Sequence, residues 1–461
     1  MPDAWAPDRA TVSFWERQLP ARTRRAPLPG DARVDVCIVG GGFTGLWAAY
    51  YLASAAPGLR IMVVDARYCG YGASGRNGGW ASNFIAGSRR TYAAAAGREA
   101  TIALQREMDA SLAEIVRVAD TERIDADIVT GGVLTVARWR SQWDRLQEQV
   151  EAAEAWGEQD LELLNADELS RRLRVSDALG GSWSPHCARI DPAKLVRGLA
   201  DRVESLGVQV HEETPVTGVG EHLVETTHGR IRAEHIVVAT EGFLARMHGH
   251  RRRTLPMNSS MIVTDRLPDR VWDGIGWAGA ELLGDAAHVY FYAQRTADDR
   301  IALGGRGNPY RYGSRVDTDG RTPRSTVASL RAQLVDCFPA LRDVGVADAW
   351  SGVLGVPRDW CSSVVQNTST GVITAGGYVG HGVTAANLAG RTIRDLVLGA
   401  DTELLRMPWV GHRVRSWEPE PLRWLGVHGM YAAYRAADGW ERRTGRGTSL
   451  LAAAANRVAG R

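Results

Sequence analysis

Residues 35–46, DVCIVGGGFTGL, decide the fold of this chain. The stretch opens with a short β-branched run, and glycines follow at Gly40, Gly42 and Gly45 in the spacing GxGxxG. The first glycine permits a tight turn, the second lets the backbone approach a pyrophosphate, and the third allows a helix to pack closely on a strand. The N-terminus of that helix then offers free N–H groups to phosphates. The pattern therefore predicts a strand, a phosphate-binding turn and a helix.

The residues that follow complete a dinucleotide-binding unit. A helical pattern continues from the last glycine, and residues 59–64, LRIMVV, predict a second buried strand. Asp65 ends this strand, about 20 residues after Gly45, where a carboxylate can accept hydrogen bonds from the hydroxyl groups of an adenosine ribose. Ala66 and Arg67 come next and are expected to lie against the same nucleotide. One βαβ unit of a parallel sheet is predicted here.

A second glycine cluster, GASGRNGG at residues 72–79, comes soon after the acidic residue. The GxGxxG pattern does not distinguish NAD from FAD, so this loop is informative. It can run along a pyrophosphate and reach an isoalloxazine ring, with the Ser74 hydroxyl, the glycine N–H groups and the Arg76 and Asn77 side chains as donors. The whole loop is predicted to contact the cofactor: Gly72, Ala73, Ser74, Gly75, Arg76, Asn77, Gly78 and Gly79.

Two later segments repeat the order of strand and small-residue turn. Residues 237–242, VVATEG, place Ala239, Thr240 and Gly242 beside the dinucleotide, and Val216 is expected nearby. Residues 375–384, AGGYVGHGVT, start a helix whose N-terminus would stabilise negative charge on a reduced flavin pyrimidine. The cofactor-binding residues predicted in this turn are Gly377, Gly380, His381, Gly382, Val383 and Thr384.

Composition excludes several classes of protein. With 461 residues, 44% hydrophobic and 23% charged, the chain fits about two or three globular domains. A net charge of +2 gives no electrostatic footprint for nucleic acid. Apolar runs stay short of the roughly 18–20 residues that span a bilayer, and residues 1–19 lack the pattern of a secretory signal. Five scattered cysteines predict neither disulfides nor a metal site. We expect a cytoplasmic protein.

The chain resembles the FAD-dependent amine and amino-acid oxidoreductases of the D-amino acid oxidase and glycine oxidase type. It is most similar there to γ-glutamylputrescine oxidase-like proteins. The stretches that carry the resemblance span about residues 31–400: DVCIVGGGFTGL, GYGASGRNGGW, RIDPAKLVRGLA, DDRIALGGRG, FPAL, AWSGV and GYVGHGVTAANLAGR. The resemblance implies FAD and hydride transfer from an amine-bearing carbon to flavin N5. Some relatives attach FAD covalently, but non-covalent FAD is expected here because no attachment motif is found. The imine product would hydrolyse to an aldehyde or keto compound, and O2 would reoxidise the flavin to give H2O2.

The order of the segments predicts an α/β fold with a discontinuous, Rossmann-like FAD-binding domain over residues 31–90, 185–250 and 362–400. An α+β substrate domain is inserted over 91–184 and 251–361, and the resemblance implies that it carries a large mixed or antiparallel sheet over the flavin. Residues 1–30 are expected to be a loose leader with a short helix near 14–18. Residues 401–461 are expected to be a helical tail on the cofactor domain. Helices are also predicted near 94–123, 139–157, 323–337 and 383–398.

Amine oxidation of this kind needs alignment and exclusion of water rather than a catalytic triad. The catalytic candidates are His381 in the flavin-facing turn, Arg76 in the glycine loop, and Tyr290 with Tyr292, which would share one face of a strand. Core packing is the competing explanation for each tyrosine and for the imidazole. Which small amine is the substrate stays open.

Lys194 is the only lysine of the chain. Sarcosine oxidase-like relatives have a lysine directly after the GHGx turn, where this chain has Thr384. Those oxidases also use a lysine above the flavin to assist O2, whereas Lys194 is predicted at a helix start beside the cofactor domain. A dehydrogenase that passes electrons to a quinone or a carrier protein is therefore the alternative function. Cys361, the cysteine nearest a plausible flavin attachment point, lies in PRDWCSS, which matches no attachment motif.

Overall fold

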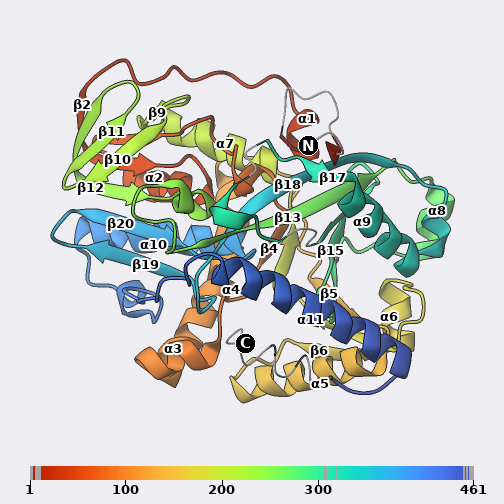
Figure 1. Cartoon of the computed structure of the whole chain (residues 1–461). Helices are drawn as coiled ribbons and strands as arrows, with labels where there is room; N and C mark the ends of the chain where they lie inside the picture. Colours follow the sequence, from red (N-terminus) through yellow and green to blue (C-terminus); the bar gives the residue numbers. More distant parts are fainter. Residues whose placement is uncertain are drawn as a thin grey trace.

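The computed structural model describes residues 4–5, 12–305, 309–316, 319–449, 452 and 455. Two large sheets organise this part of the chain, and they lie side by side at the left and the right of Figure 1. None of its helices combines the length and apolarity needed to span a bilayer. An α/β architecture with one large mixed sheet is confirmed.

The first sheet is built from three separated stretches of the chain. Its strand order is β10-β11-β12-β2-β3-β9, with β20 paired to β12 and β19 to β20. The central strands β12, β2, β3 and β9 run parallel, and β20 joins β12 in the same direction. The strands are β2 (Ala32–Val39), β3 (Ile61–Val64), β9 (Gln209–His211), β10 (Val216–Gly220), β11 (Leu223–Thr226), β12 (Arg230–Val238), β19 (Ser363–Asn367) and β20 (Val372–Gly376).

Both faces of this sheet are buried, which explains the uninterrupted apolar run that begins the chain's first glycine motif. On one face, Val36 and Ile38 pack with helices α2 (Phe43–Ala55), α7 (Pro192–Ser205) and α10 (Gly382–Leu398). On the other, Cys37 and Val39 pack with Ile231 and neighbouring apolar residues. The predicted order of strand, turn and helix is confirmed for β2 and α2 and for β20 and α10, and β12 ends in a turn as predicted.

The helix α4 (Arg98–Thr121) belongs to the same core. Its residues Leu104, Met108 and Ile115 are buried with those of α2 and α10. The sequence places residues 91–184 in the substrate domain, but this helix packs on the first sheet's side of the molecule. The division into domains otherwise stays a prediction.

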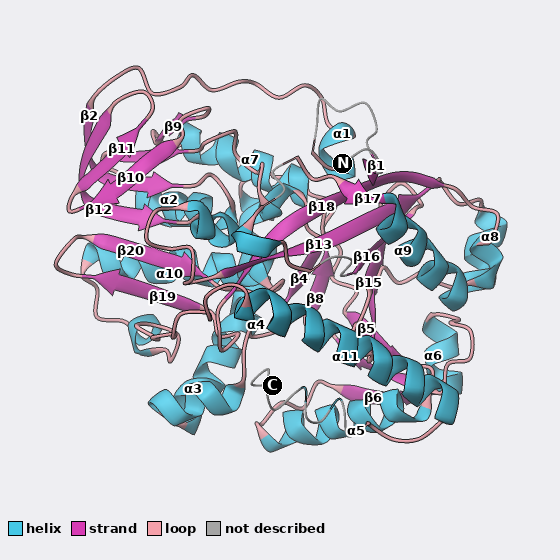
Figure 2. Ribbon diagram, in the orientation of Figure 1, coloured by secondary structure: helices cyan, strands magenta, loops and turns pink. Residues whose placement is uncertain are grey.

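The second sheet has the order β18-β13-β16-β15-β14-β5-β7-β6. It is mixed, because β14 runs parallel to β5 while the other neighbours are antiparallel. Helices α8 (Asp269–Ile275) and α9 (Arg324–Cys337) cover it at the right of Figure 2. Its strands are β5 (Val133–Ala137), β6 (Glu162–Asn165), β7 (Gly180–Ser184), β13 (Leu255–Thr264), β14 (Leu282–Asp285), β15 (Tyr292–Arg295), β16 (Ile301–Gly305) and β18 (Val346–Val356).

Short elements connect and flank the two sheets. Four short strands form two small two-stranded ribbons. They are β1 (Ala4–Trp5) with β17 (Thr322–Pro323), and β4 (Trp80–Ser82) with β8 (Cys187–Arg189). The flanking helices are α1 (Phe14–Arg17), α3 (Arg89–Ala96), α5 (Arg140–Ala155), α6 (Ala166–Arg172) and α11 (Leu422–Thr444). The helices predicted near 139–157 and 323–337 are thus confirmed as α5 and α9.

The helical tail packs differently from its prediction. Helix α11 crosses in front of α5 and β5 in Figure 1 rather than lying on the cofactor sheet. Its buried Glu441 accepts hydrogen bonds from Ser141 and Arg145 of α5, and from His288 beside β14. The expectation of a tail on the cofactor domain holds for its first part, because Leu404, Met407 and Trp409 are buried in the core of α2 and α10. It fails for the C-terminal half of α11, whose buried acid pairs with residues of the second layer.

Candidate functional site

A cavity of about 740 Å³ runs along the carboxyl ends of the parallel strands. This volume lies within the range of about 300–1,000 Å³ that is usual for ligand pockets. Its wall comes from the β2–α2 turn, the loop after β3, the start of β10, the turn after β12, the end of β18 and the start of α10. In parallel sheets of this kind, ligands bind at the carboxyl ends of the strands.

One end of the cavity is built by the β2–α2 turn. Gly42 is the N-cap residue of α2 and provides no side-chain cap, while the N–H of Phe43 donates to Ser74 Oγ at 2.8 Å. A Cβ on Gly45 would lie 2.0 Å from the Gly40 carbonyl oxygen, so only glycine lets helix and strand approach this closely. The helix thus presents its positive end to the cavity, as phosphate binding requires.

Asp65 stands beside that turn at the end of β3. Its Oδ2 accepts from the N–H of Gly41 and its Oδ1 from the N–H of Arg67, both at 2.8 Å. Burial raises the pKa of this carboxyl, although both hydrogen bonds oppose the rise. A carboxylate has further lone pairs, so Asp65 can still accept from the hydroxyl groups of a ribose. The donor set and the acid together fit a dinucleotide.

Another part of the wall is formed where α10 starts. Gly380, Gly382 and Val383 line the cavity there. The hydroxyl of the next residue, Thr384, is fully buried and has no hydrogen-bond partner among the described residues. This buried residue does not line the cavity.

Glu241 is a cavity-lining residue that the sequence analysis passed over. Its Oε1 accepts from the N–H groups of Gly377 and Tyr378, each at 3.1 Å, and its Oε2 accepts from the N–H of Gly355. Burial raises the pKa of this carboxyl to about 7, against the effect of these hydrogen bonds. Glu241 therefore ties β18 to the turn before α10. The sequence feature that could have identified Glu241 is the acidic residue shortly after the strand in VVATEG.

The chain matches the family model described as "FAD dependent oxidoreductase" over residues 35–396. The chain belongs to this family. The "Probable oxidoreductase OrdL" of Rhizobium meliloti is 31% identical, over 85% of this chain and 89% of that protein. The "Gamma-glutamylputrescine oxidoreductase" of Escherichia coli is 32% identical, over 79% and 84%. The crystal structure of glycine oxidase from Geobacillus kaustophilus shares the fold, with a TM-score of 0.69, 22% identity and coverage of 83% and 99%.

FAD is accordingly the cofactor of this oxidoreductase. The cavity brings most of the residues predicted to bind it together. Those that line its wall are Gly40, Gly42, Phe43, Thr44, Asp65, Ala66, Arg67, Gly72, Ala73, Ser74, Asn77, Val216, Ala239, Thr240, Gly242, Gly380, Gly382 and Val383. Those that do not line it are Gly45, Gly75, Arg76, Gly78, Gly79, Gly377, His381 and Thr384. The roles of individual residues stay predictions.

Arg76 lies behind the glycine loop of the oxidoreductase rather than on its cavity side. Its side chain is almost fully buried, its Nε donates to the Tyr71 carbonyl at 2.6 Å, and its Nη1 donates to the Ser351 carbonyl at 3.3 Å. The guanidinium also lies over the Tyr71 ring, 4.4 Å from the centroid. These contacts anchor the loop to β18 and favour a positioning role over a catalytic one.

The two tyrosine candidates do not share a strand face. Tyr290 precedes β15, which begins at Tyr292, so the prediction that placed both on one strand is wrong. The connection between β14 and β15 extends to residue 291, so it includes Tyr290, which an alternating strand pattern would place in β15. The Tyr292 hydroxyl pairs with Ser259 Oγ at 2.8 Å, and its ring packs edge-on against Trp80. Neither tyrosine lines the described cavity.

The two remaining candidates, His381 and Cys361, both lie outside the cavity wall. His381 is the N-cap residue of α10, its N–H donates to the Tyr378 carbonyl, and its ring meets Phe84 edge-on at 5.5 Å. Cys361 is fully buried beside Gly87 and does not line the cavity, which agrees with non-covalent FAD.

Proposed function

We propose that this oxidoreductase oxidises the C–N bond of a small amine or amino-acid-like substrate. The cavity carries the proposal, because it joins a phosphate-binding helix end to the α10 turn in a chain that is 32% identical to a γ-glutamylputrescine oxidoreductase. FAD, when bound, supplies the electron acceptor. With O2 as the final oxidant of a primary amine, one amine, one O2 and one water give one carbonyl compound, one ammonia and one hydrogen peroxide.

In this scheme the chain's own residues bind and orient the cofactor and the substrate, and they exclude water from the site. The α2 N-terminus and Asp65 would hold the dinucleotide, and the start of α10 would direct its positive end at the flavin pyrimidine. Two N–H groups of that turn are not free to bind the flavin, because Gly377 and Tyr378 donate them to Glu241. The remaining donors begin at the first turn of α10. No proton-transfer residue is required to abstract a hydride.

A panel of amines, mixed anaerobically with the purified protein, tests the proposal. Polyamine derivatives, N-alkyl amino acids, aminophosphonates and simple amino acids cover the substrate classes. We expect one class to bleach the visible flavin absorbance and to release a carbonyl compound in equal amount. Bleaching by a hydroxy acid or by NADH, with no response to any amine, would overturn the proposal.

A dehydrogenase with a quinone or protein acceptor is the second candidate, and Lys194 favours it. Lys194 Nζ pairs with Asp127 Oδ1 at 2.8 Å at the start of α7, and this side chain does not line the cavity. The absence of Lys194 from the cavity wall supports an electron acceptor whose reduction does not depend on a lysine.

Lys194→Met is expected to leave the rate of flavin reoxidation by O2 unchanged within about twofold. The ion pair is half-exposed, and such pairs contribute only about 0–1 kcal/mol to stability. Stopped-flow mixing of the reduced enzyme with O2 gives the rate directly. A large loss of O2 reactivity in this variant would show that the lysine reaches the flavin.

His381→Ala is expected to lower the flavin reduction potential and to slow anaerobic reduction by about fivefold, with flavin content kept. The imidazole stands at the positive end of α10, where it would favour the reduced, anionic flavin by an amount typical of helix-terminus charges, about 1 kcal/mol. Phe84→Leu is the matched control, because it removes the ring packed on His381 and keeps the imidazole. If both variants shift the potential equally, the histidine acts only through packing.

A further inference from the structure

The leader, predicted to be loose, is firmly attached in the described part of the chain. From Val12 onward it forms α1 and then runs along the edge of the first layer, as the red trace at the top of Figure 1 shows. Leu28 donates its N–H to Thr214 Oγ1 at 3.0 Å, and Arg197 donates to the Pro20 carbonyl at 2.7 Å. The short helix predicted near residues 14–18 is confirmed as α1. The expectation of a loose leader was wrong for residues 12–30, because their arginines and this helix find partners far along the chain, while residues 1–3 and 6–11 lie outside the described part.

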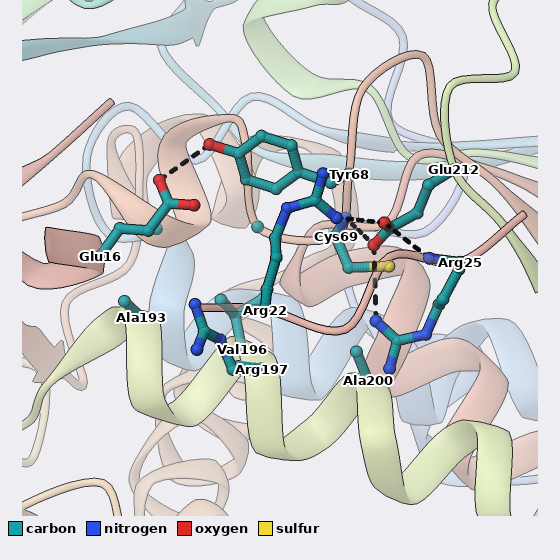
Figure 3. Close-up of a pocket in the computed structure, with 12 residues that line it drawn as sticks. Glu16, Arg22, Arg25, Tyr68, Cys69, Ala193, Val196, Arg197, Ala200 and Glu212 are labelled. Carbon is teal, nitrogen blue, oxygen red and sulfur yellow. Dashed lines mark hydrogen bonds and ion pairs between the residues drawn. The ribbon is translucent and has the colours of Figure 1, made fainter. Parts of the chain in front are cut away.

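The first attachment is a buried carboxylate shared by two arginines. Glu212 is 2% exposed and pairs with the guanidinium groups of Arg22 and Arg25 (Figure 3). The same carboxylate accepts from the N–H of Cys69 at 3.1 Å. One acid thus joins the leader to the loop that follows Asp65. Removing either side would leave a buried charge unpaired, which is costly.

The second attachment is made by Tyr68 of the same loop. Its hydroxyl donates to Glu16 Oε2 at 2.8 Å. The Arg22 guanidinium lies over its ring, 4.1 Å from the centroid, and Figure 3 shows the two side chains face to face. A cation over an aromatic face contributes about 0.5–2 kcal/mol, more where it is desolvated.

The third attachment reaches the glycine loop itself. Ser13 Oγ donates to the Gly75 carbonyl at 2.7 Å, and Trp15 Nε1 donates to the Asn77 carbonyl at 2.9 Å. Asn77 in turn closes the loop, since its Nδ2 donates to the Ser74 carbonyl and its Oδ1 accepts from the N–H of Gly79. Helix α1 and its N-cap residue Ser13 therefore fix two carbonyl groups of a loop in which half of the residues 72–79 are glycine.

The opposite side of this loop is the wall of the cofactor cavity. Asp65, Gly72, Ser74 and Asn77 line that cavity, while the leader covers the loop from behind. The space between leader and loop is only about 30 Å³, room for one or two waters and no ligand. A glycine-rich loop loses much conformational entropy when it is ordered, so contacts from behind lower the cost of binding the cofactor in front.

We propose that residues 13–25 form a strap that holds the loop over residues 65–79 in its FAD-binding conformation. Ser13, Trp15, Arg22 and Arg25 are positioning residues in this scheme: they act on FAD through the loop and touch neither the flavin nor the substrate. The inference rests on the cofactor placement described above and concerns how FAD is retained.

The test compares FAD dissociation from strap variants and a control variant of the full chain. Arg22→Ala with Arg25→Ala removes both guanidinium partners of Glu212. Trp15→Phe removes the indole N–H together with part of the ring, and keeps an aromatic side chain in the packing with Phe14 and Trp350. Arg24→Ala is the control, because Arg24 is exposed between the two strap arginines. We expect the dissociation constant of FAD to rise at least tenfold in the double variant and about fivefold in Trp15→Phe, with no change in the control. Arg22→Lys with Arg25→Lys should recover part of the affinity.

The readouts separate the strap from general stability. FAD release is followed by recovery of flavin fluorescence at a temperature where circular dichroism shows each apoprotein folded. Should the double variant fail to fold, Trp15→Phe decides alone. If the strap variants bind FAD as tightly as Arg24→Ala while Gly42→Val loses it, the strap proposal falls and the cofactor site stands. If Gly42→Val also keeps its FAD, the cofactor placement is at fault.

Discussion

Gly42→Val is expected to yield a folded apoprotein without bound FAD. Gly42 lines the cavity at the N-terminus of α2, and a Cβ there would lie 2.9 Å from Ser74 Oγ. A branched side chain would occupy the place where the pyrophosphate must approach the N–H groups of the helix. The expected result is a flavin-to-protein ratio below about one tenth of wild type, measured by visible absorbance after heat release.

Gly58→Val is the matched control for that experiment. Gly58 lies in an exposed turn after α2, and no atom stands within 4 Å of the position that its Cβ would occupy. This variant should keep its full flavin content. Full content in Gly42→Val as well, with unchanged circular dichroism, would contradict the placement of the pyrophosphate at α2.

Glu441→Leu is expected to lower the free energy of unfolding of the apoprotein by about 3–5 kcal/mol, the usual loss when one partner of a buried ion pair is removed. Glu441 is fully buried in α11 and accepts from Ser141, Arg145 and His288. The leucine would leave the Arg145 guanidinium without its acid. Urea unfolding measures the difference, and Glu403→Leu, which breaks an exposed pair with Arg406, should cost less than about 1 kcal/mol.

Acid unfolding provides an independent check on the same group. Burial alone would raise the pKa of Glu441, but hydrogen bonds from Ser449, Arg145, His288 and Ser141 lower the pKa to about 2. The ordinary pKa is 4.5, so the carboxylate contributes stability that is complete above pH 4.5 and is lost as the pH falls toward 2. Stability of the wild type should fall more steeply over this interval than that of Glu441→Leu. Equal slopes would mean that the carboxylate is not stabilised in the fold.

The parts of the fold that could be predicted are those written in short stretches of sequence. Glycine spacing after a β-branched run located the turns at Gly42 and Gly380, and apolar periodicity located α4, α5 and α9 to within a few residues. These signals are local, because a tight turn or a buried helix face constrains residues next to one another. The turns at Gly42, Gly242 and Gly380 were then expected to lie close together, because the carboxyl ends of parallel strands share one edge of a sheet.

The parts that could not be predicted depend on partners far apart in the chain. In the sequence Glu241 looks like any polar residue in a turn after a strand. Its partners, Gly355 and Gly377, are brought to it only by the fold. The arginines of the leader look like solvated charges until Glu212 is seen beneath them. The register of Tyr290 was missed because a turn interrupts the alternation. Arginine and glutamate are common in this sequence, so composition does not indicate which of them are buried.

The discontinuous first sheet also has a consequence for synthesis of the protein. Strand β2 leaves the ribosome early, but it pairs with β12, and β12 pairs with β20 of a much later stretch. Until residues 372–386 have emerged, the edge of β12 lacks its partner β20, and the cofactor cavity lacks the turn at the start of α10. A nascent chain in this state presents an unpaired strand edge, which invites aggregation and chaperone binding. The wall of the flavin cavity is therefore incomplete until residues 380–386 have been synthesised.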